Sequence, residues 1–157
     1  MKLKVYIETT VVSYLTARKS SVPVLAGRQQ ITLEWWENRR HLFDLSISEI
    51  VVQEAEDGDS DAVCRRLEVL RGLPLLVVTE EAVQLADALV KDGVIPKEFV
   101  EDSLHIAVAA VNGMDYLLTW NCRHIANAAL RPRIERVVES YGYLCPIICT
   151  PDELMED

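Results

Sequence analysis

The 157-residue sequence lacks any hydrophobic run long enough to cross a membrane. Its longest apolar runs, such as 73–78 and 106–111, are far shorter than the roughly 20 residues that span a bilayer. The opening residues 1–8 also lack the longer apolar stretch and small-residue cleavage site of a signal peptide. We therefore expect no membrane segment and a cytoplasmic location.

Cysteine is scarce, with four residues in the chain. Cys64, Cys122, Cys145 and Cys149 do not form a disulfide framework at this chain length, and a reducing compartment would keep them as thiols. Cys145 and Cys149 would make only half of a zinc site, because no second cysteine pair or nearby histidine pair completes one. Cysteines buried in strands are the better interpretation.

Basic residues are outnumbered, with 16 Lys and Arg against 25 Asp and Glu and a net charge of -9. This balance excludes a general polyanion binder, because nonspecific affinity for nucleic acid comes from neutralising phosphates with Lys and Arg. A nuclease is still allowed. Metal-binding carboxylates add negative charge, and the bound cation reverses the local sign where a phosphate must sit.

The sequence does contain an alternation of strand and helix patterns. Its 50% hydrophobic and 26% charged residues describe a single globular domain, 1–157, that buries a full core. Strands are expected at 3–7, 43–47, 75–78, 116–119 and 146–149. Helices are expected at 10–17, 28–39, 49–57, 60–71, 80–91, 97–111 and 131–141. The alternation predicts an α/β fold of parallel βαβ units with helices on both faces of the sheet.

Polar residues follow two of these strands at the point where each ends. Glu8 closes the run 3–7, and Asn121 follows the run 116–119. Ligands of an open parallel sheet bind outside the carboxyl ends of its strands, so both positions suit a binding site. Glu8 also fits a solvated loop residue or a helix cap.

Asp102 stands near the start of a helix that is apolar nearly all round and is therefore expected to be buried. Burying an unpaired charge costs on the order of several kcal/mol. This carboxylate must therefore be paired, solvated by a cleft or bound to metal. A salt bridge to a neighbouring arginine is the alternative. With Glu8 and Asn121, Asp102 offers three separated oxygen ligands, which suggests a divalent cation and phosphodiester chemistry.

Glu98 and His105 share a helical face with Asp102. Glu98 is interpreted as an exposed first-turn acid favoured by the helix dipole. His105 is compatible with a metal ligand or a general acid, but we favour a hydrogen-bonded structural histidine. After the second strand, Glu54 lies one turn beyond the apolar Ile50 and can turn towards the strand ends, whereas Glu49 resembles a capping acid.

Four segments resemble the four motifs of PIN-domain nucleases. In order along the chain they are YIETTVVSYL at 6–15, SISEIVVQE at 46–54, EDSLHIAVAA at 101–110 and DYLLTWN at 115–121. The closing TPDEL at 150–154 also looks like the end of bacterial members of that family. Together these segments cover nearly the whole chain.

The resemblance implies a three-layer α/β/α domain with a central, mainly parallel sheet. It implies acidic residues that bind Mg²⁺ or Mn²⁺ and hydrolyse RNA, often as the VapC-type toxin of a type II toxin–antitoxin pair with an antitoxin protein as partner. Carried over by motif, the catalytic and metal-binding residues are Glu8, Glu54, Asp102 and Asn121. The expected substrate-binding residues are Thr10, Thr119, Arg123 and His124.

Surface residues outside the motifs add two expectations. Arg18 and Lys19 follow the first helix and suit phosphate contacts, although they suit ordinary surface charges equally well. The second helix carries Leu33, Trp35 and Trp36, of which one tryptophan is expected in the core. That helix has apolar surface to spare, and the resemblance implies a family that commonly forms homodimers. We therefore expect a homodimer.

The sequence departs from the PIN pattern at two positions. Glu8 stands where the family usually has Asp, which keeps the charge but extends the carboxylate by about 1.5 Å. Asn121 stands where Asp is common, so a carbonyl ligand remains but a charge is lost. Because Mg²⁺ is held chiefly by carboxylates, waters and substrate phosphates, we expect one firmly held metal ion.

Three other functions compete with this interpretation. An aspartate-nucleophile phosphatase needs a DxD pair that Glu8-Thr-Thr10 lacks, and a receiver domain needs an Asp after the third strand, where Thr79 stands. The serious rival is a PIN-like domain that binds RNA or a protein without cutting. In that case the two departures would have abolished catalysis.

Overall fold

The computed structural model describes residues 1–156 of the chain. Within them, parallel strands form one sheet in the order β3-β2-β1-β4-β5. The strands are β1 (Leu3–Ile7), β2 (Phe43–Ser48), β3 (Leu75–Leu76), β4 (Tyr116–Leu118) and β5 (Ile147–Cys149). All of the strands predicted from the sequence are present, and the predicted α/β class is confirmed.

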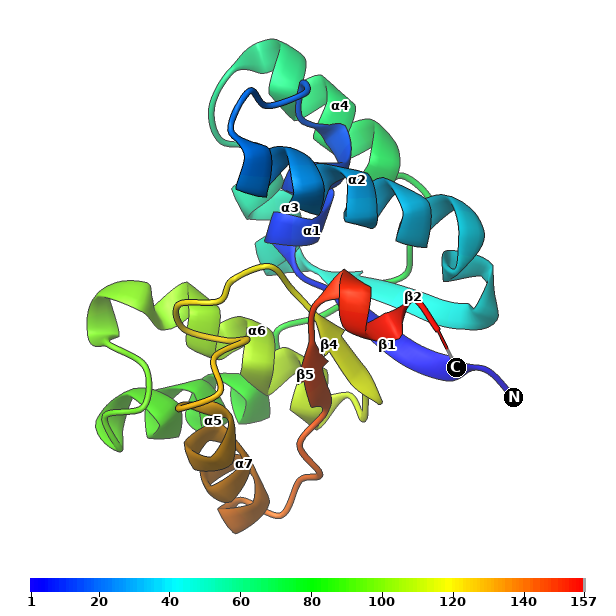
Figure 1. Ribbon diagram of the computed structural model, residues 1–157. Coiled ribbons are helices and arrows are strands. Elements are labelled where there is room, and N and C mark those ends of the chain that lie inside the picture. The colour runs from blue at the N-terminus through cyan, green and yellow to red at the C-terminus, as the bar shows by residue number, and fades with distance from the viewer. Residues whose placement is uncertain (157) are drawn as a thin grey trace.

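Helices connect the strands. The α-helices are α1 (Thr9–Thr16), α2 (Pro23–Asn38), α3 (Glu49–Ala55), α4 (Ser60–Leu70), α5 (Glu80–Lys91), α6 (Val100–Val111) and α7 (Arg131–Ser140). In the described part of the chain, short 3-10 turns lie at η1 (Arg40–Leu42), η2 (Lys97–Phe99) and η3 (Pro151–Leu154). Figure 1 shows α1 to α4 on one side of the sheet and α5 to α7 on the other, so the three-layer arrangement is confirmed.

The centre of the sheet is also the centre of the core. Val5, Tyr6 and Ile7 of β1 are fully buried, because β1 pairs with β2 on one side and β4 on the other and both sheet faces are covered. In the helical layer formed by α5 to α7, residues Ile106 to Ala109 of α6 are also fully buried. The chain order reverses between β2 and β4 around β1, and such a switch point places a crevice at the carboxyl ends of the strands.

The second helix begins earlier than predicted. The expected start at residue 28 was wrong, because α2 begins at Pro23 with Val22 in an extended conformation before it. Proline fits the first helical position, where its missing N–H would have had no partner in the helix. Pro23 therefore starts the helix, and the polar connection between α1 and α2 is shorter than expected.

Two other boundaries differ for local reasons. The predicted strand 75–78 pairs only at Leu75 and Leu76, because the backbone N–H of Val78 donates to the carboxylate of Glu49 at 3.1 Å instead. The predicted helix 97–111 starts as the 3-10 turn η2, and the backbone of Phe99 (φ -119°, ψ 38°) separates it from α6. Glu49 therefore lies in the first turn of α3 and also binds the backbone of the segment that follows β3.

Within residues 1–156, no helix combines the length and the apolar character needed to cross a membrane.

Candidate active site

Glu8 lies immediately after β1 and caps α1. Its carboxylate accepts hydrogen bonds from the backbone N–H of Thr10 at 3.2 Å, from the Thr10 hydroxyl and from the Thr119 hydroxyl at 2.5 Å. The residue is only 3% exposed. Burial raises the pKa of Glu8 above its ordinary value, although His105, Thr10 and Thr119 each act to lower it. The helix-cap interpretation of Glu8 is thus correct in geometry, and the capping carboxylate is also a buried acid at a strand end.

Glu54 extends from α3 to the same edge of the sheet. Its Oε1 accepts from the Thr9 hydroxyl at 2.7 Å and pairs with Nε2 of His105 at 2.5 Å. Burial on its own would raise the pKa of Glu54, but the hydrogen bond and charge of His105 and the Thr9 hydroxyl outweigh it, so the pKa is lowered. Glu54 is therefore held as a carboxylate.

His105 lies on α6 and is fully buried. Burial acts to lower the pKa of the imidazole, but the Glu54 hydrogen bond and the negative charges of Glu8, Glu54 and Asp102 raise it overall. Its Nδ1 lies 2.7 Å from the hydroxyl of Tyr6, which in turn lies 2.7 Å from Oγ of Ser48. The structure therefore shows a hydrogen-bonded histidine, as favoured from the sequence, and places it directly beside the acids.

These side chains form a compact group. One ligand atom from each of Glu8, Glu54 and His105 lies within 4.8 Å of the others. The three residues come from the end of β1, from α3 and from α6, so the group sits where both helical layers meet the carboxyl edge of the sheet. Two carboxylates and an imidazole are a donor set that binds divalent transition metals.

Asp102 is placed beside this group but not in it. Its Oδ2 pairs with Nδ1 of His124 at 2.9 Å, and the two side chains are 15% and 9% exposed. The His124 ring also packs against Phe99 with a 4.3 Å separation of ring centroids. A salt bridge to an arginine was the expected alternative for Asp102, and the structure shows His124 as the partner.

Asn121 follows β4 and begins a turn. Its Oδ1 accepts from the backbone N–H of His124 at 3.0 Å, and its own N–H donates to Oγ1 of Thr119 at 2.9 Å. Thr119 and Thr10 in turn donate to Glu8, and Oγ1 of Thr10 accepts from the backbone N–H of Trp120 at 2.8 Å. The two threonines thus connect the ends of β1 and β4 and hold Glu8 in place.

No protein-family model and no curated protein matches the sequence. Solved structures do match. VapC20 of Mycobacterium tuberculosis, described as a Sarcin-Ricin loop cleaving toxin, is similar with a TM-score of 0.58 at 14% identity, over 89% of this chain and 96% of that one. VapBC2 of Rickettsia felis, bound to a DNA fragment from their promoter, is similar with a TM-score of 0.53 at 14% identity, over 94% and 98% of the two chains.

The chain has the PIN-domain fold. The resemblance of the four sequence segments to PIN motifs is therefore confirmed at the level of the fold. In this PIN fold, motif residues Glu8 and Glu54 are brought together, while Asp102 and Asn121 lie on the side of the site where His124 contacts both.

Sequence reasoning missed several residues that shape this PIN site. Tyr6 and Ser48 look like ordinary strand residues, and nothing in the local pattern indicates that their hydroxyls meet a histidine. Thr9 likewise carries no signal of its contact with Glu54. His105 does have one, because it shares a helical face with Asp102 on an otherwise apolar helix.

The predicted basic contacts lie in different surroundings. The guanidinium of Arg123 stacks over Phe99 at 5.3 Å, next to the site. Arg18 lies 3.8 Å from Asp61, and both side chains are largely exposed at 81% and 75%. His124 is 9% exposed and occupied by Asp102, so its contact with a substrate would need the pair to open.

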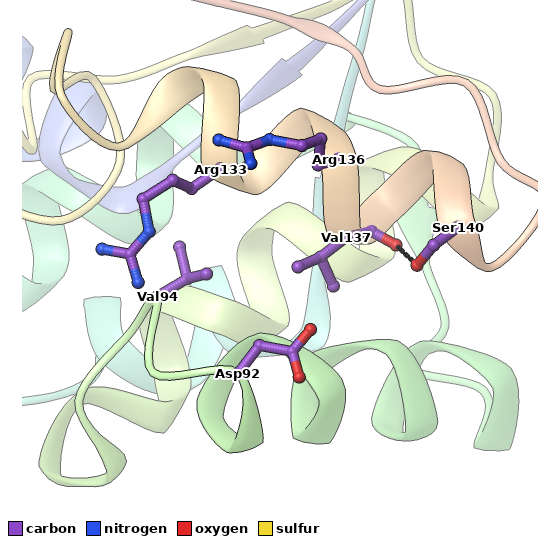
Figure 2. A pocket seen from close by; sticks show the side chains of 6 residues that line it. All are labelled: Asp92, Val94, Arg133, Arg136, Val137 and Ser140. Carbon is purple, nitrogen blue, oxygen red and sulfur yellow. Dashed lines mark hydrogen bonds between the residues drawn. The ribbon is translucent and has the colours of Figure 1, made fainter.

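The structure also has a cleft away from these acids. It encloses about 460 Å³ between the end of α5 and the helix α7. Figure 2 shows side chains of both signs facing it. Its lining residues are Asp92, Val94, Arg133, Arg136, Val137 and Ser140. None of the predicted site residues lines this cleft, and we place the candidate active site at the acid group instead.

Proposed function

We propose that this chain is a divalent-metal-dependent endoribonuclease that hydrolyses RNA phosphodiester bonds. The observation that carries the proposal is the Glu8–Glu54–His105 group at the carboxyl edge of a PIN fold. The description of VapC20 as a Sarcin-Ricin loop cleaving toxin supports RNA as the substrate class. Residues 1–157 are proposed to act as one domain, of which the last residue lies outside the described part of the structure.

The donor chemistry fits a divalent cation. Glu8 is a carboxylate whose pKa is raised by burial, and a cation beside it would offset the cost of burying its charge. Glu8 and Glu54 would hold Mg²⁺ or Mn²⁺, with Asp102 and Asn121 as further catalytic and metal-site residues. When bound, the cation supplies positive charge at the phosphodiester and a water nucleophile of lowered pKa.

The residues of the chain have separate parts in this proposal. The hydroxyls of Thr10 and Thr119 orient Glu8 through the hydrogen bonds described above. Arg123, at the exposed rim beside Phe99, is proposed to contact substrate phosphates. Asp102 is proposed to orient the His124 ring, and the backbone N–H of His124 donates to Asn121. His124 thereby connects Asp102 to the turn at Asn121.

We further propose that the protein is the cytoplasmic toxin of a type II toxin–antitoxin pair, with a protein antitoxin as partner. The similarity to VapBC2 supports this assignment. A homodimer is also proposed, with α2 as the contact surface. Trp35 is fully buried, as expected for one tryptophan of this helix, so the proposed contact surface uses Val24 and Leu33, which are 65% and 38% exposed.

Cleavage of a fluorogenic single-stranded RNA in Mn²⁺ tests the enzyme proposal. Wild-type protein is expected to cleave it. Asp102→Ala, purified identically, should cleave about 10–100-fold more slowly, because a proposed metal-site carboxylate is lost and His124 loses its partner. Glu68→Ala, which removes an exposed acid on α4, serves as the matched control and should keep full activity. Equal rates in wild type and Asp102→Ala would point to a contaminating nuclease, and absence of cleavage would favour the noncutting domain.

A further inference from the structure

We propose that His105 is a positioning residue: it fixes the Glu54 carboxylate through a buried relay that runs from Ser48 through Tyr6 to His105 and Glu54. The proposal rests on the proposed function for its metal-binding consequence. It assigns a role to a histidine that the acidic motifs leave unexplained. It also makes Glu54 a ligand whose geometry is set from the opposite helical layer.

The relay crosses the structure from one side of the sheet to the other. Ser48 ends β2, Tyr6 lies on the central strand β1, His105 lies on α6 and Glu54 lies on α3. Its three contacts measure 2.7, 2.7 and 2.5 Å in that order. Ser48, Tyr6 and His105 are each 0% exposed, so water does not compete for these hydrogen bonds.

The imidazole is held at both ring nitrogens. A carboxylate only accepts hydrogen bonds, so Nε2 of His105 carries the proton that it shares with Glu54. The Tyr6 hydroxyl meets Nδ1 and is able to donate or accept, and the Ser48 hydroxyl has the same freedom. Rotation of the ring would break both contacts inside the core, so the orientation of Nε2 towards Glu54 is fixed.

Glu54 needs this support because its own helix is short. The helix α3 has seven residues, and the Glu54 side chain is 34% exposed. Among residues 1–156, both hydrogen bonds to the Glu54 carboxylate end on Oε1, from Thr9 and from His105. Oε2 is therefore the oxygen left for a cation, and Thr9 alone would hold the side chain if His105 were removed.

The competing role for His105 is direct ligation of the cation through Nε2. That role requires Nε2 to give up Glu54, because a nitrogen that carries a proton cannot bind a metal ion. In the structure Nε2 is already paired with Glu54 at 2.5 Å. The geometry therefore favours positioning over ligation, and the two roles predict different spectra.

The test is a titration of the full-length protein with Mn²⁺, read by electron paramagnetic resonance, with pulsed measurements of nitrogen coupling. His105→Leu is expected to weaken Mn²⁺ binding about 10–100-fold, as loss of a residue that orients a ligand usually does. His105→Gln, whose amide N–H replaces the Nε2 donor, should restore most of that affinity. His41→Gln changes an exposed histidine and is the matched control.

Tyr6→Phe keeps the test decisive if His105→Leu fails to fold. It removes only the hydroxyl at Nδ1, so Mn²⁺ affinity should fall by a smaller factor while the circular dichroism spectrum stays unchanged. Wild-type affinity in a folded His105→Leu, or in Tyr6→Phe where His105→Leu does not fold, would overturn the proposal. A directly bonded nitrogen coupling in wild type that disappears in His105→Gln would also overturn it, because His105 would then be a ligand.

These results separate the inference from the enzyme proposal. Mn²⁺ binding that depends on His105, without RNA cleavage, would support positioning and remove the ribonuclease assignment. RNA cleavage with Mn²⁺ affinity unchanged in His105→Leu would overturn positioning alone. Failure of the wild type to bind Mn²⁺ would overturn both.

Discussion

At the scale of single residues, the site is built from carboxylates whose surroundings differ. Glu8 is buried and has its pKa raised by that burial, whereas Glu54 has its pKa lowered because His105 and Thr9 outweigh its desolvation. The two acids lie in one group, yet ionisation costs more free energy for Glu8 than for Glu54. In the metal-free protein, Glu54 therefore stabilises the fold as an anion, and ionised Glu8 opposes it.

Glu8→Gln should remove a pH dependence from the stability of the metal-free protein. The raised pKa means that the folded state binds the Glu8 proton more tightly than the unfolded state does. The wild-type free energy of unfolding should therefore decline as the pH rises from 4.5, the ordinary value, through the raised pKa, and Glu8→Gln should lack this part of the decline.

Urea unfolding in EDTA at a series of pH values measures this difference, and parallel stability curves for the two proteins would contradict it. Saturating Mn²⁺ provides the internal control. Metal should stabilise the wild type more than Glu8→Gln, because binding to the folded state adds its free energy to that of folding.

At the scale of elements, the site depends on side-chain contacts between segments that are distant in the sequence. Thr32 of α2 is fully buried and accepts from the indole N–H of Trp120 at 2.8 Å, while it donates to the carbonyl of Arg28 at 2.6 Å. This contact attaches α2 to the segment after β4. That segment continues directly into Asn121.

Thr32→Val should destabilise the fold by about 1–3 kcal/mol, because the buried indole N–H of Trp120 loses its acceptor. Thr16→Val is the matched control, since among the described residues the Thr16 hydroxyl bonds only to a carbonyl of its own helix, at 2.9 Å, and the cost of its loss should be smaller. Chemical denaturation of both variants measures the difference. Equal costs would show that the contact between α2 and Trp120 contributes nothing of its own.

At the scale of the whole molecule, the cysteines report on how completely the chain is folded. Cys64 and Cys122 are exposed, whereas Cys145 is half-buried and Cys149 is buried. Burial raises the pKa of both Cys145 and Cys149 to about 12. The expectation of cysteines buried in a strand is confirmed for Cys149 in β5, and Cys145 lies just before that strand.

At pH 8, a thiol-reactive dye should therefore label two cysteines quickly and two slowly. A pKa of about 12 leaves on the order of one thiolate in ten thousand at that pH, and the thiolate is the reactive form. Urea should equalise the four rates. Rapid labelling of Cys149 in native conditions, detected by mass spectrometry of peptides, would show that the edge of the sheet at β5 opens easily.

The sequence by itself determined the alternation of strands and helices, the covering of both sheet faces by helices and the strand-end position of Glu8. Hydrophobic periodicity and caps act over a few residues, so they are visible in a local pattern. Where the pattern misled, as at the start of α2 and the end of β3, the causes were a proline at a helix start and a long-range contact from Glu49.

Only the tertiary structure decided which side chains meet at the site. His105 and Glu54 are 51 positions apart, and Asp102 and His124 are 22 apart. Tyr6 and His105, whose contact completes the relay, are separated by 99 positions. Such pairings depend on the packing of two helical layers against a sheet edge, and no local pattern of residue types encodes the distance between two side chains that the fold brings together.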